Sequence, residues 1–281
     1  MIYFPNCKIN IGLRVLEKRM DGFHNIESVF YPLNLCDALE IRPLKEGTTK
    51  ITITGIDSNI SSKEFDKNTC IKAYNLLKQD FPQLKEVNIH LDKAIPTFAG
   101  LGGGSSDGSY TLKLLNFIFN LNLTNNQLIS YAEKIGSDCM FFINNTPTLV
   151  SGRGEKMKEI NLSLKDYYIV LIKPNINIST KEAYQEVDQD KKETTALTSL
   201  SSLETLDIKH WKKEIVNDFE KPLFKKYPIL KQTKDMLYEN GAIYSQMSGS
   251  GSTIYGIFEK EVDLKRIKQD NITFIHQEKM L

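Results

Sequence analysis

Apolar residues in the first third of the chain follow patterns typical of strands. The segment 2–16 is rich in Ile, Val and Leu, and shorter runs follow at 38–41 and 51–54. Val87, Ile89 and Leu91 alternate with polar residues, as expected of a strand with one buried face. The spacing between these strands changes to that of a helix over 69–77.

Helical spacing returns at 110–118, directly after a glycine-rich loop. The pair Thr124 and Gln127 has the spacing of a capping box, so a second helix is expected to begin there. Gly136 is expected to end it in the C′ position. Asp138 follows this helix end, and we expect an aromatic strand after it.

The second half of the chain mixes both kinds of element. We expect a buried strand at 167–173, a helix at Pro228–Asn240 closed by Gly241, and a strand at 253–258. The polar segment 185–202 is expected to be a mobile surface segment, with a short helix near 197–203. Because strands and helices do not alternate strictly, an α+β fold is favoured over a doubly wound parallel sheet.

Composition narrows the class of protein. The chain has 281 residues, enough for two modest domains, and its formal net charge is +1. This balance argues against a nucleic-acid binder. No apolar run reaches the length of a membrane span, no secretory signal is evident, and the four scattered cysteines suggest neither disulfides nor zinc. We therefore expect a cytoplasmic protein without membrane or nucleic-acid partners; its oligomeric state stays open.

The glycine-rich loop is the strongest chemical signal. It reads Gly100-Leu101-Gly102-Gly103-Gly104-Ser105-Ser106-Asp107 and precedes the predicted helix, whose first N–H groups suit an anion such as a polyphosphate. Ser105 stands where a Walker A loop needs Lys and where the dinucleotide fingerprint needs Gly, which excludes both motifs. A plain flexible turn capped by serine is the alternative for this segment alone.

Three segments together resemble the GHMP kinases, a family that includes galactokinase, homoserine kinase and mevalonate kinase. They are the loop preceded by Pro96 and Ala99, an N-terminal segment from Pro5 to Leu13, and a C-terminal segment from Met247 to Thr253. The resemblance implies a two-domain fold, 1–155 and 156–281, with the active site in the cleft between the domains. It implies that ATP contacts Asn68, Pro96, Ala99, Gly100, Leu101, Gly102, Gly103, Gly104, Ser105 and Ser106.

A further segment, Arg19-x-Asp21-Gly22-Phe23-His24, resembles the branch of this family that phosphorylates 4-diphosphocytidyl-2-C-methyl-D-erythritol in the non-mevalonate isoprenoid pathway. The resemblance makes Asp138 the catalytic base and places Lys8 beside it. It assigns the substrate, a cytidine diphosphate derivative, to Asn10, Phe23, His24, Tyr184, Ser248, Gly249 and Ser250. ATP and Mg²⁺ are the expected cofactors, and no residue is assigned to the metal.

Three other interpretations compete with this one. A different GHMP kinase, of the homoserine or mevalonate type, does not explain the base-stacking segment at 21–24, because its substrate contains no base. A catalytically silent nucleotide-binding protein does not need both Lys8 and Asp138. A purely structural α+β domain does not explain why three separate loops are suited to binding anions. Taken singly, Asp138 also reads as a helix cap, Lys8 as a solvated lysine and Asn68 as a helix N-cap.

Overall fold

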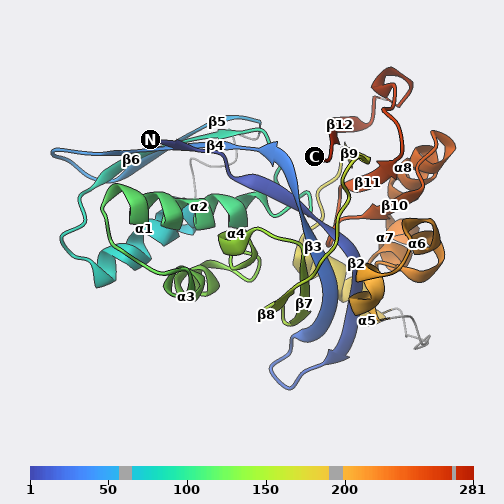
Figure 1. Ribbon diagram of the computed structural model, residues 1–281, viewed down its shortest axis with the longest axis horizontal. Helices are drawn as coiled ribbons and strands as arrows, with labels where there is room; N and C mark the ends of the chain where they lie inside the picture. Colours follow the sequence, from blue (N-terminus) through green and yellow to red (C-terminus); the bar gives the residue numbers. More distant parts are fainter. Residues whose placement is uncertain (57–64, 190–198, 268–269) are drawn as a thin grey trace. The chain divides into compact units, whose positions relative to one another are not determined.

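The computed structural model describes residues 1–56, 65–189, 199–267 and 270–281 (Figure 1). The chain forms two compact units. The first comprises residues 1–8, 34–97 and 102–146, and the second comprises 9–33, 98–101 and 147–281. These units do not follow the single boundary expected at 155/156, because residues 9–33 group with the second unit. The domain limits 1–155 and 156–281 stay a prediction.

The first unit combines one sheet with four helices. The sheet has the order β1-β4-β6-β5, in which only β5 and β6 are parallel among the described pairs. Its strands are β1 (Ile2–Tyr3), β4 (Ala38–Pro43), β5 (Lys50–Gly55) and β6 (Val87–Lys93). Its helices are α1 (Thr69–Asp80), α2 (Gly103–Ile118), α3 (Asn125–Ile135) and α4 (Phe141–Asn144). Figure 1 shows α1 and α2 on one face of the sheet.

The alternating pattern in β6 explains how this sheet meets its helices. Val87, Ile89 and Leu91 are buried, whereas the residues between them are exposed. Leu77 of α1 and Leu112 of α2 are buried as well, and α2 contacts β4 of the same sheet. The capping box of Thr124 and Gln127 begins α3, as predicted.

The second unit contains two further sheets. One has the order β2-β3-β7-β8 and the other β10-β11-β9-β12. The strands are β2 (Asn6–Lys18), β3 (His24–Cys36), β7 (Thr148–Gly152), β8 (Lys156–Glu159), β9 (Tyr168–Pro174), β10 (Tyr244–Met247), β11 (Ile254–Phe258) and β12 (Ile272–Lys279). The ends of β2 and β3, residues 6–8 and 34–36, belong to the first unit.

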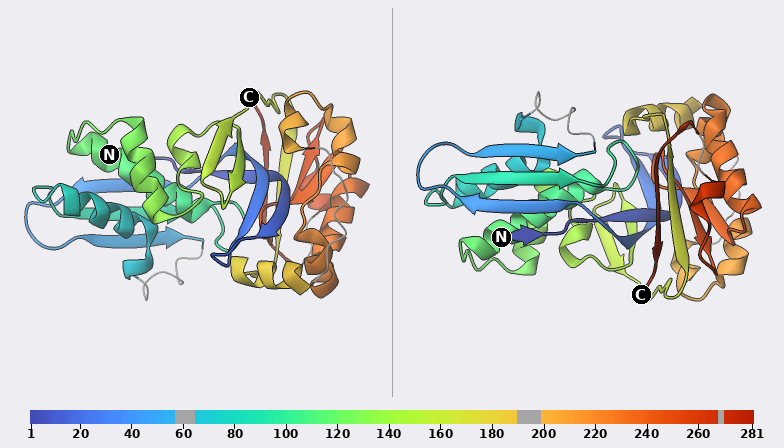
Figure 2. Two further views of the ribbon diagram at one scale, coloured as in Figure 1. Left: turned by 90° about the horizontal axis from the view of Figure 1, so that it is seen from below. Right: turned by 90° about the horizontal axis from the view of Figure 1, so that it is seen from above.

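Helices cover one sheet of the second unit. They are α5 (Thr180–Gln189), α6 (Ile208–Glu214), α7 (Glu220–Lys226) and α8 (Pro228–Glu239), and α8 packs on β9, β10 and β11 (Figure 2). Short 3₁₀ helices occur at Phe65–Lys67, Leu200–Glu204 and Leu264–Arg266. The core of the unit joins Leu13 and Val15 of β2 to Val170, Phe219 and Met247.

Several expected elements need correction. Residues 185–189 belong to α5, so the polar segment begins as helix; residues 190–198 lie outside the described part of the chain. The aromatic residues after Asp138 form the helix α4 and not a strand. Gly136 does end α3, but its φ of 178° is ordinary extended backbone and not the left-handed C′ conformation. The long strand β3 was not predicted at all.

Candidate active site

Lys8 and Asp138 form an ion pair in the first unit. Lys8 Nζ lies 3.3 Å from Asp138 Oδ2. The lysine side chain is 4% exposed and the carboxylate 32%, so the pair joins a buried cation to a carboxylate that solvent can reach. The residues are 130 positions apart in the chain, counted from 8 to 138. The structure thus brings together the two residues that the sequence assigned to catalysis.

The turn that carries Asp138 is held from both sides. Cys139 N donates to Gly136 O at 3.1 Å, and Ser109 Oγ of α2 donates to Cys139 O at 2.7 Å. Cys139 is fully buried, and burial raises the pKa of its thiol to about 11. The buried Cys139 and Met140 therefore act as packing groups that anchor the turn while the Asp138 carboxylate stays accessible.

The helix α2 begins inside the glycine loop, at Gly103. Gly102 is the N-cap, with a left-handed φ of 70°. The first intrahelical bond runs from Ser106 N to Gly102 O at 2.9 Å, so the N–H groups of 103–105 precede the hydrogen-bonded helix. A Cβ at Gly104 would meet nothing within 4 Å. The exposed backbone at Gly104 is therefore the place where an anion can approach the helix N-terminus.

Gly102 also brings this helix N-terminus to the ion pair. A Cβ there would lie 3.1 Å from Lys8 Cε and 3.1 Å from Phe142 Cζ. Only a glycine fits this close approach at a positive φ without strain. The lysine and the candidate phosphate cradle are therefore neighbours within the first unit. Ser105 is half-buried and Ser106 is fully buried. The contacts of both serines with ATP stay predictions.

A buried charge cluster, which the sequence analysis missed, braces the loop. Lys93 Nζ donates to Asp107 Oδ2 at 2.8 Å and also to Asp37 Oδ2. Asp37 Oδ1 accepts from the backbone N–H groups of Ala94 and Ile95, at 2.7 and 2.8 Å. The cluster therefore ties the N-terminal half of α2 to the segment that enters the loop. Burial raises the pKa of Asp107 to about 7, against the opposing effect of Lys93.

The second unit holds the other motif segments together. Gly100 packs so closely on the C-terminal loop that a Cβ would lie 2.0 Å from Ser248 O. Ser248 Oγ donates to Gly100 O at 2.9 Å and accepts from Asn10 N at 3.1 Å. Asn10 Nδ2 donates to Ser28 Oγ at 2.8 Å. The fully buried Ser248 thus links residues of all three motifs, which makes it a structural bridge.

Asn217 fixes the loop at 248–252 through hydrogen bonds to its backbone. Its Nδ2 donates to Met247 O and to Gly249 O, both at 2.8 Å, and its side chain is buried. Glu220 Oε1 accepts from Met247 N at 2.8 Å, and its other oxygen pairs with Lys234 at 2.6 Å. Two buried groups of one short segment therefore set the loop's shape.

The predicted base-binding residues divide into an exposed ring and a stacked pair. Phe23 is 53% exposed at the turn between β2 and β3. His24 stacks on Tyr184, with ring centroids 5.4 Å apart and planes 11° from parallel. Tyr184 meets Phe219 edge-on at 5.0 Å. His24 and Tyr184 are therefore neighbours in the structure. Their roles in substrate binding stay predictions.

The remaining residues assigned to ATP or substrate lie at a helix N-cap, in buried positions and in the loop at 248–252. Asn68 accepts a hydrogen bond from Cys70 N at 2.8 Å and so is the N-cap of α1. Pro96, Ala99 and Leu101 are buried. Ser250 is half-buried, and its hydroxyl lies 3.4 Å from Thr180 Oγ1.

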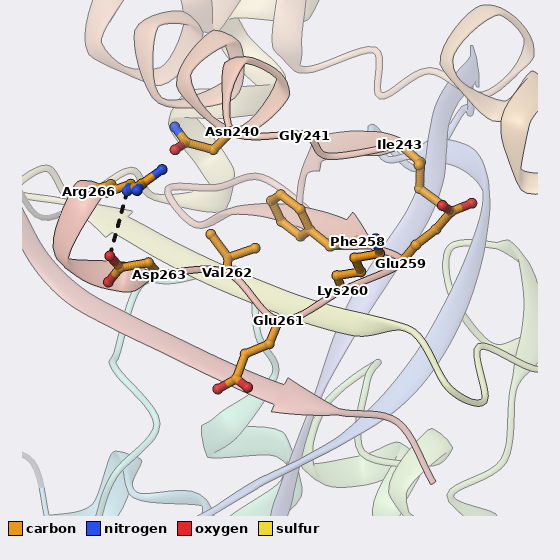
Figure 3. A pocket seen from close by; sticks show the side chains of 10 residues that line it. All are labelled: Asn240, Gly241, Ile243, Phe258, Glu259, Lys260, Glu261, Val262, Asp263 and Arg266. Atoms are coloured by element: carbon orange, nitrogen blue, oxygen red, sulfur yellow. Dashed lines mark ion pairs between the residues drawn. The ribbon is translucent and has the colours of Figure 1, made fainter.

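Within the described residues there is no group of three or more His, Cys, Asp or Glu side chains placed to hold a metal ion. No helix in this part of the chain is long and apolar enough to cross a membrane. A cavity of about 580 Å³ near the end of α8 is lined by ten residues, among them Arg266 and Asp263, and by none of the predicted site residues (Figure 3).

Comparison with known proteins decides the family. The model of the GHMP kinases N terminal domain matches residues 68–145, and that of the GHMP kinases C terminal domain matches 199–274. A protein of Parabacteroides distasonis named 4-diphosphocytidyl-2-C-methyl-D-erythritol kinase is 46% identical over 265 residues, 94% of each chain. This chain belongs to the GHMP kinase family. It is a phosphotransferase with the two-domain α+β fold, and both predictions are confirmed.

Further relatives and solved structures support the same family. A Cytophaga hutchinsonii protein of the same name is 46% identical over 277 residues, 97% of each chain. A crystal structure of 4-(cytidine 5'-diphospho)-2C-methyl-D-erythritol kinase superposes with a TM-score of 0.76 at 28% identity, covering 92% of this chain and 90% of that one. The Methanococcus jannaschii mevalonate kinase, 15% identical with a TM-score of 0.71, shares the fold. The branch recognised from the sequence is therefore confirmed.

Proposed function

We propose that this GHMP kinase transfers the γ-phosphoryl group of ATP to the 2-hydroxyl of 4-diphosphocytidyl-2-C-methyl-D-erythritol, a step of non-mevalonate isoprenoid biosynthesis. One observation carries the reaction type: Lys8 and Asp138 lie 3.3 Å apart, and Lys8 touches the loop that opens α2. The names of relatives that match nearly the whole chain support the substrate. The cytoplasmic location stays a prediction.

The chemistry assigned to the pair follows from its geometry. The accessible Asp138 carboxylate accepts the proton of the substrate hydroxyl as the phosphoryl group is transferred. The buried Lys8 ammonium orients that carboxylate and stabilises negative charge that develops on the alcohol oxygen. A lysine held against the loop at Gly102 keeps this arrangement fixed before substrate arrives.

ATP is the proposed phosphoryl donor. The N–H groups of 103–105 and the positive end of the α2 macrodipole hold its phosphates at the open backbone of Gly104. Mg²⁺, the proposed metal, neutralises phosphate charge when bound. We assign it no protein ligand.

The cytidylyl group of the substrate is assigned to the second unit. Phe23 offers an exposed aromatic face, which suits stacking with a pyrimidine. The stacked pair of His24 and Tyr184 supplies a polar edge and a second aromatic surface. The buried Asn10, Ser248 and Gly249 shape the loop beside which the substrate is proposed to bind.

An ADP-release assay tests the function. MgATP is offered with the cytidylyl substrate, with homoserine and with mevalonate in parallel, and the Asp138→Asn variant measures background ATP hydrolysis. Release above that background with the cytidylyl substrate alone is expected. Release with another alcohol keeps the kinase and removes the cytosine assignment. Release with none of them contradicts the proposed reaction and favours a silent nucleotide-binding protein.

A further inference from the structure

The turn between β2 and β3 fixes the backbone of Phe23. Phe23 N donates to Asp21 Oδ1 at 3.2 Å, and Arg19 N donates to Phe23 O at 2.7 Å. Gly22 completes the turn with a φ of 83°. These contacts determine where the ring is attached but not how it is oriented, because a half-exposed phenyl ring on a turn can change its rotamer.

Arg153 supplies the missing constraint on the ring. Its guanidinium carbon lies 4.0 Å from the centroid of the Phe23 ring, which is the geometry of a cation–π contact. Arg153 belongs to the turn between β7 and β8, and the pairing of Gly152 with Ile26 places this turn beside the start of β3. The cation–π contact therefore joins two turns that are far apart in the sequence and that the pairing of β3 with β7 brings close.

The turn that carries Arg153 has a fixed shape. Glu155 folds its carboxylate back to accept from Arg153 N, and a Cβ at Gly152 would lie 2.5 Å from Glu155 Oε1. Gly152 also has a left-handed φ of 71°, so the turn requires glycine there for two reasons. These contacts hold the backbone of Arg153, and the cation–π contact with Phe23 then restrains its side chain.

The nearby carboxylates each form a hydrogen bond or ion pair with another group, and Asp21 also lies within electrostatic reach of Arg153. Asp21 pairs with Arg19 at 3.1 Å, and Glu155 is engaged with its own turn. Over the described ranges 1–56, 65–189, 199–267 and 270–281, Arg153 forms no ion pair with an N···O distance of 4.0 Å or less. The contact with the Phe23 ring therefore restrains an otherwise exposed side chain.

We propose that Arg153 is a positioning residue for the cytidylyl substrate: its guanidinium covers one face of Phe23 and thereby presents the other face to the base. This inference rests on the proposed function. A planar guanidinium suits the role because it stacks on an aromatic face, whereas the compact ammonium of a lysine makes only a point contact. Arg153 acts through Phe23 and need not touch the substrate.

Kinetics of surface variants test the proposal. Arg153→Ala is expected to raise the KM for the cytidylyl substrate, and the Kd for CMP, by roughly two- to five-fold, the loss that an exposed cation–π contact predicts. The kcat and the KM for ATP are expected to stay unchanged. Arg153→Lys is expected to fall between wild type and Arg153→Ala. Lys156→Ala, which removes an exposed charge from the neighbouring β8, is the matched control and is expected to behave like wild type.

A double-mutant cycle separates positioning from direct contact. In a Phe23→Leu background the ring is absent, so adding Arg153→Ala is expected to change neither the substrate KM nor the Kd for CMP. A full additional effect in that background overturns the proposal, because Arg153 would then act on the substrate directly. Equal losses in Arg153→Ala and Lys156→Ala overturn it as well, because they would report only a general loss of positive charge.

Measurements on the wild-type protein distinguish a wrong role for Arg153 from a wrong proposed function. Wild-type turnover of the cytidylyl substrate combined with a wild-type KM in Arg153→Ala overturns the role of Arg153 alone. A wild-type chain that neither turns over this substrate nor binds CMP overturns both conclusions. Circular dichroism of each variant confirms that the exposed substitutions leave the fold intact.

Discussion

At the scale of single residues, the site depends on the carboxylate of Asp138, which faces a buried lysine on one side and solvent on the other. Asp138 is anchored by a buried turn and paired with a buried lysine, yet about a third of its side chain is exposed, at 32%. A carboxylate that served only as a helix cap would not need a buried cation beside it. This asymmetry suits a group that is positioned by the protein and used on a ligand.

Asp138→Asn is expected to lower kcat by roughly 10²–10⁴-fold, the usual contribution of a general base, because the amide keeps the shape but cannot take a proton. The fold is expected to persist with a lower melting temperature, because the amide oxygen still accepts from the buried Lys8 but no longer balances its charge. Steady-state kinetics and a thermal melt check both. A variant with wild-type kcat would remove Asp138 from the mechanism, and titration with ATP shows whether nucleotide binding is retained.

The buried Asp107 predicts a dependence of stability on pH. Burial raises its pKa from the ordinary 3.8 to about 7, so the folded state holds this proton more tightly than the unfolded chain does. The contribution of Asp107 to stability is therefore full below pH 3.8 and is lost as the pH rises toward 7. Lys93, which pairs with it, and Asp37 beyond are the charged groups of this buried cluster.

Asp107→Asn removes this titration. Over the window from pH 4 to pH 7, the free energy of unfolding of wild type relative to the variant is expected to fall, by at most about 1.4 kcal/mol per pH unit. Urea unfolding at several pH values measures the difference, in which the other titrating groups cancel. A constant difference across the window would show that Asp107 is ionised throughout.

The alternation in β6 already indicates a buried charge in the cluster of Lys93, Asp37 and Asp107. Lys93 occupies the buried phase of β6, in register with Val87, Ile89 and Leu91. A charged residue at a buried position needs partners of opposite charge, which predicts acidic side chains nearby. Which ones they are could not be predicted, because Asp37 and Asp107 reach Lys93 only through the tertiary packing of β4, β6 and α2.

At the scale of elements, the start of α2 combines two glycines with different physical roles. Gly102 has a positive φ and no room for a side chain, whereas Gly104 has open space around it. The first is needed by the fold, and the second is needed only if a ligand approaches the backbone there. The two positions therefore form a natural pair for separating folding from binding.

Gly104→Ala is expected to leave stability unchanged or slightly higher, by about 0.5–1 kcal/mol, because alanine favours a helix. It is expected to raise the KM for ATP, because the added methyl group occupies the space assigned to the phosphates. Gly102→Ala is expected to lower stability by about 1–2 kcal/mol for the left-handed backbone alone. Urea unfolding and ATP kinetics on both variants test this; an unchanged KM in Gly104→Ala would place the phosphates elsewhere.

Local signals decided which elements could be predicted. The capping box at Thr124, the alternation in β6 and the Pro228 helix start were visible in the sequence and are confirmed. The strand β3 and the helix α4 were missed or misassigned. Phe141 and Phe142 are apolar neighbours that suit a strand or a short helix equally, and only the buried turn at Cys139 selects the helix.

At the scale of the whole molecule, the path of the chain through the two units could not be predicted from local patterns. Residues 9–33 carry most of β2 and β3, and they group with 147–281 although residues 34–97 come between them in sequence. Leu13 and Val15 belong to the same core as Phe219 and Met247. Asn217 and Asp218 add backbone-level contacts to this strand, since Asp218 N donates to Leu13 O at 2.8 Å.

This path predicts that the chain cannot be divided at 155/156 into two folding fragments. The fragment 156–281 lacks Leu13, Val15 and the strands that bring them, so its core is expected to be incomplete and its urea unfolding to lack a cooperative transition. A fragment 9–281, which loses only β1 and the first residues of β2, is the matched comparison and retains all of the second unit. Cooperative unfolding of 156–281 alone would show that residues 9–33 are accessory to a core that is already complete, and the expected domain limits would then describe folding units after all.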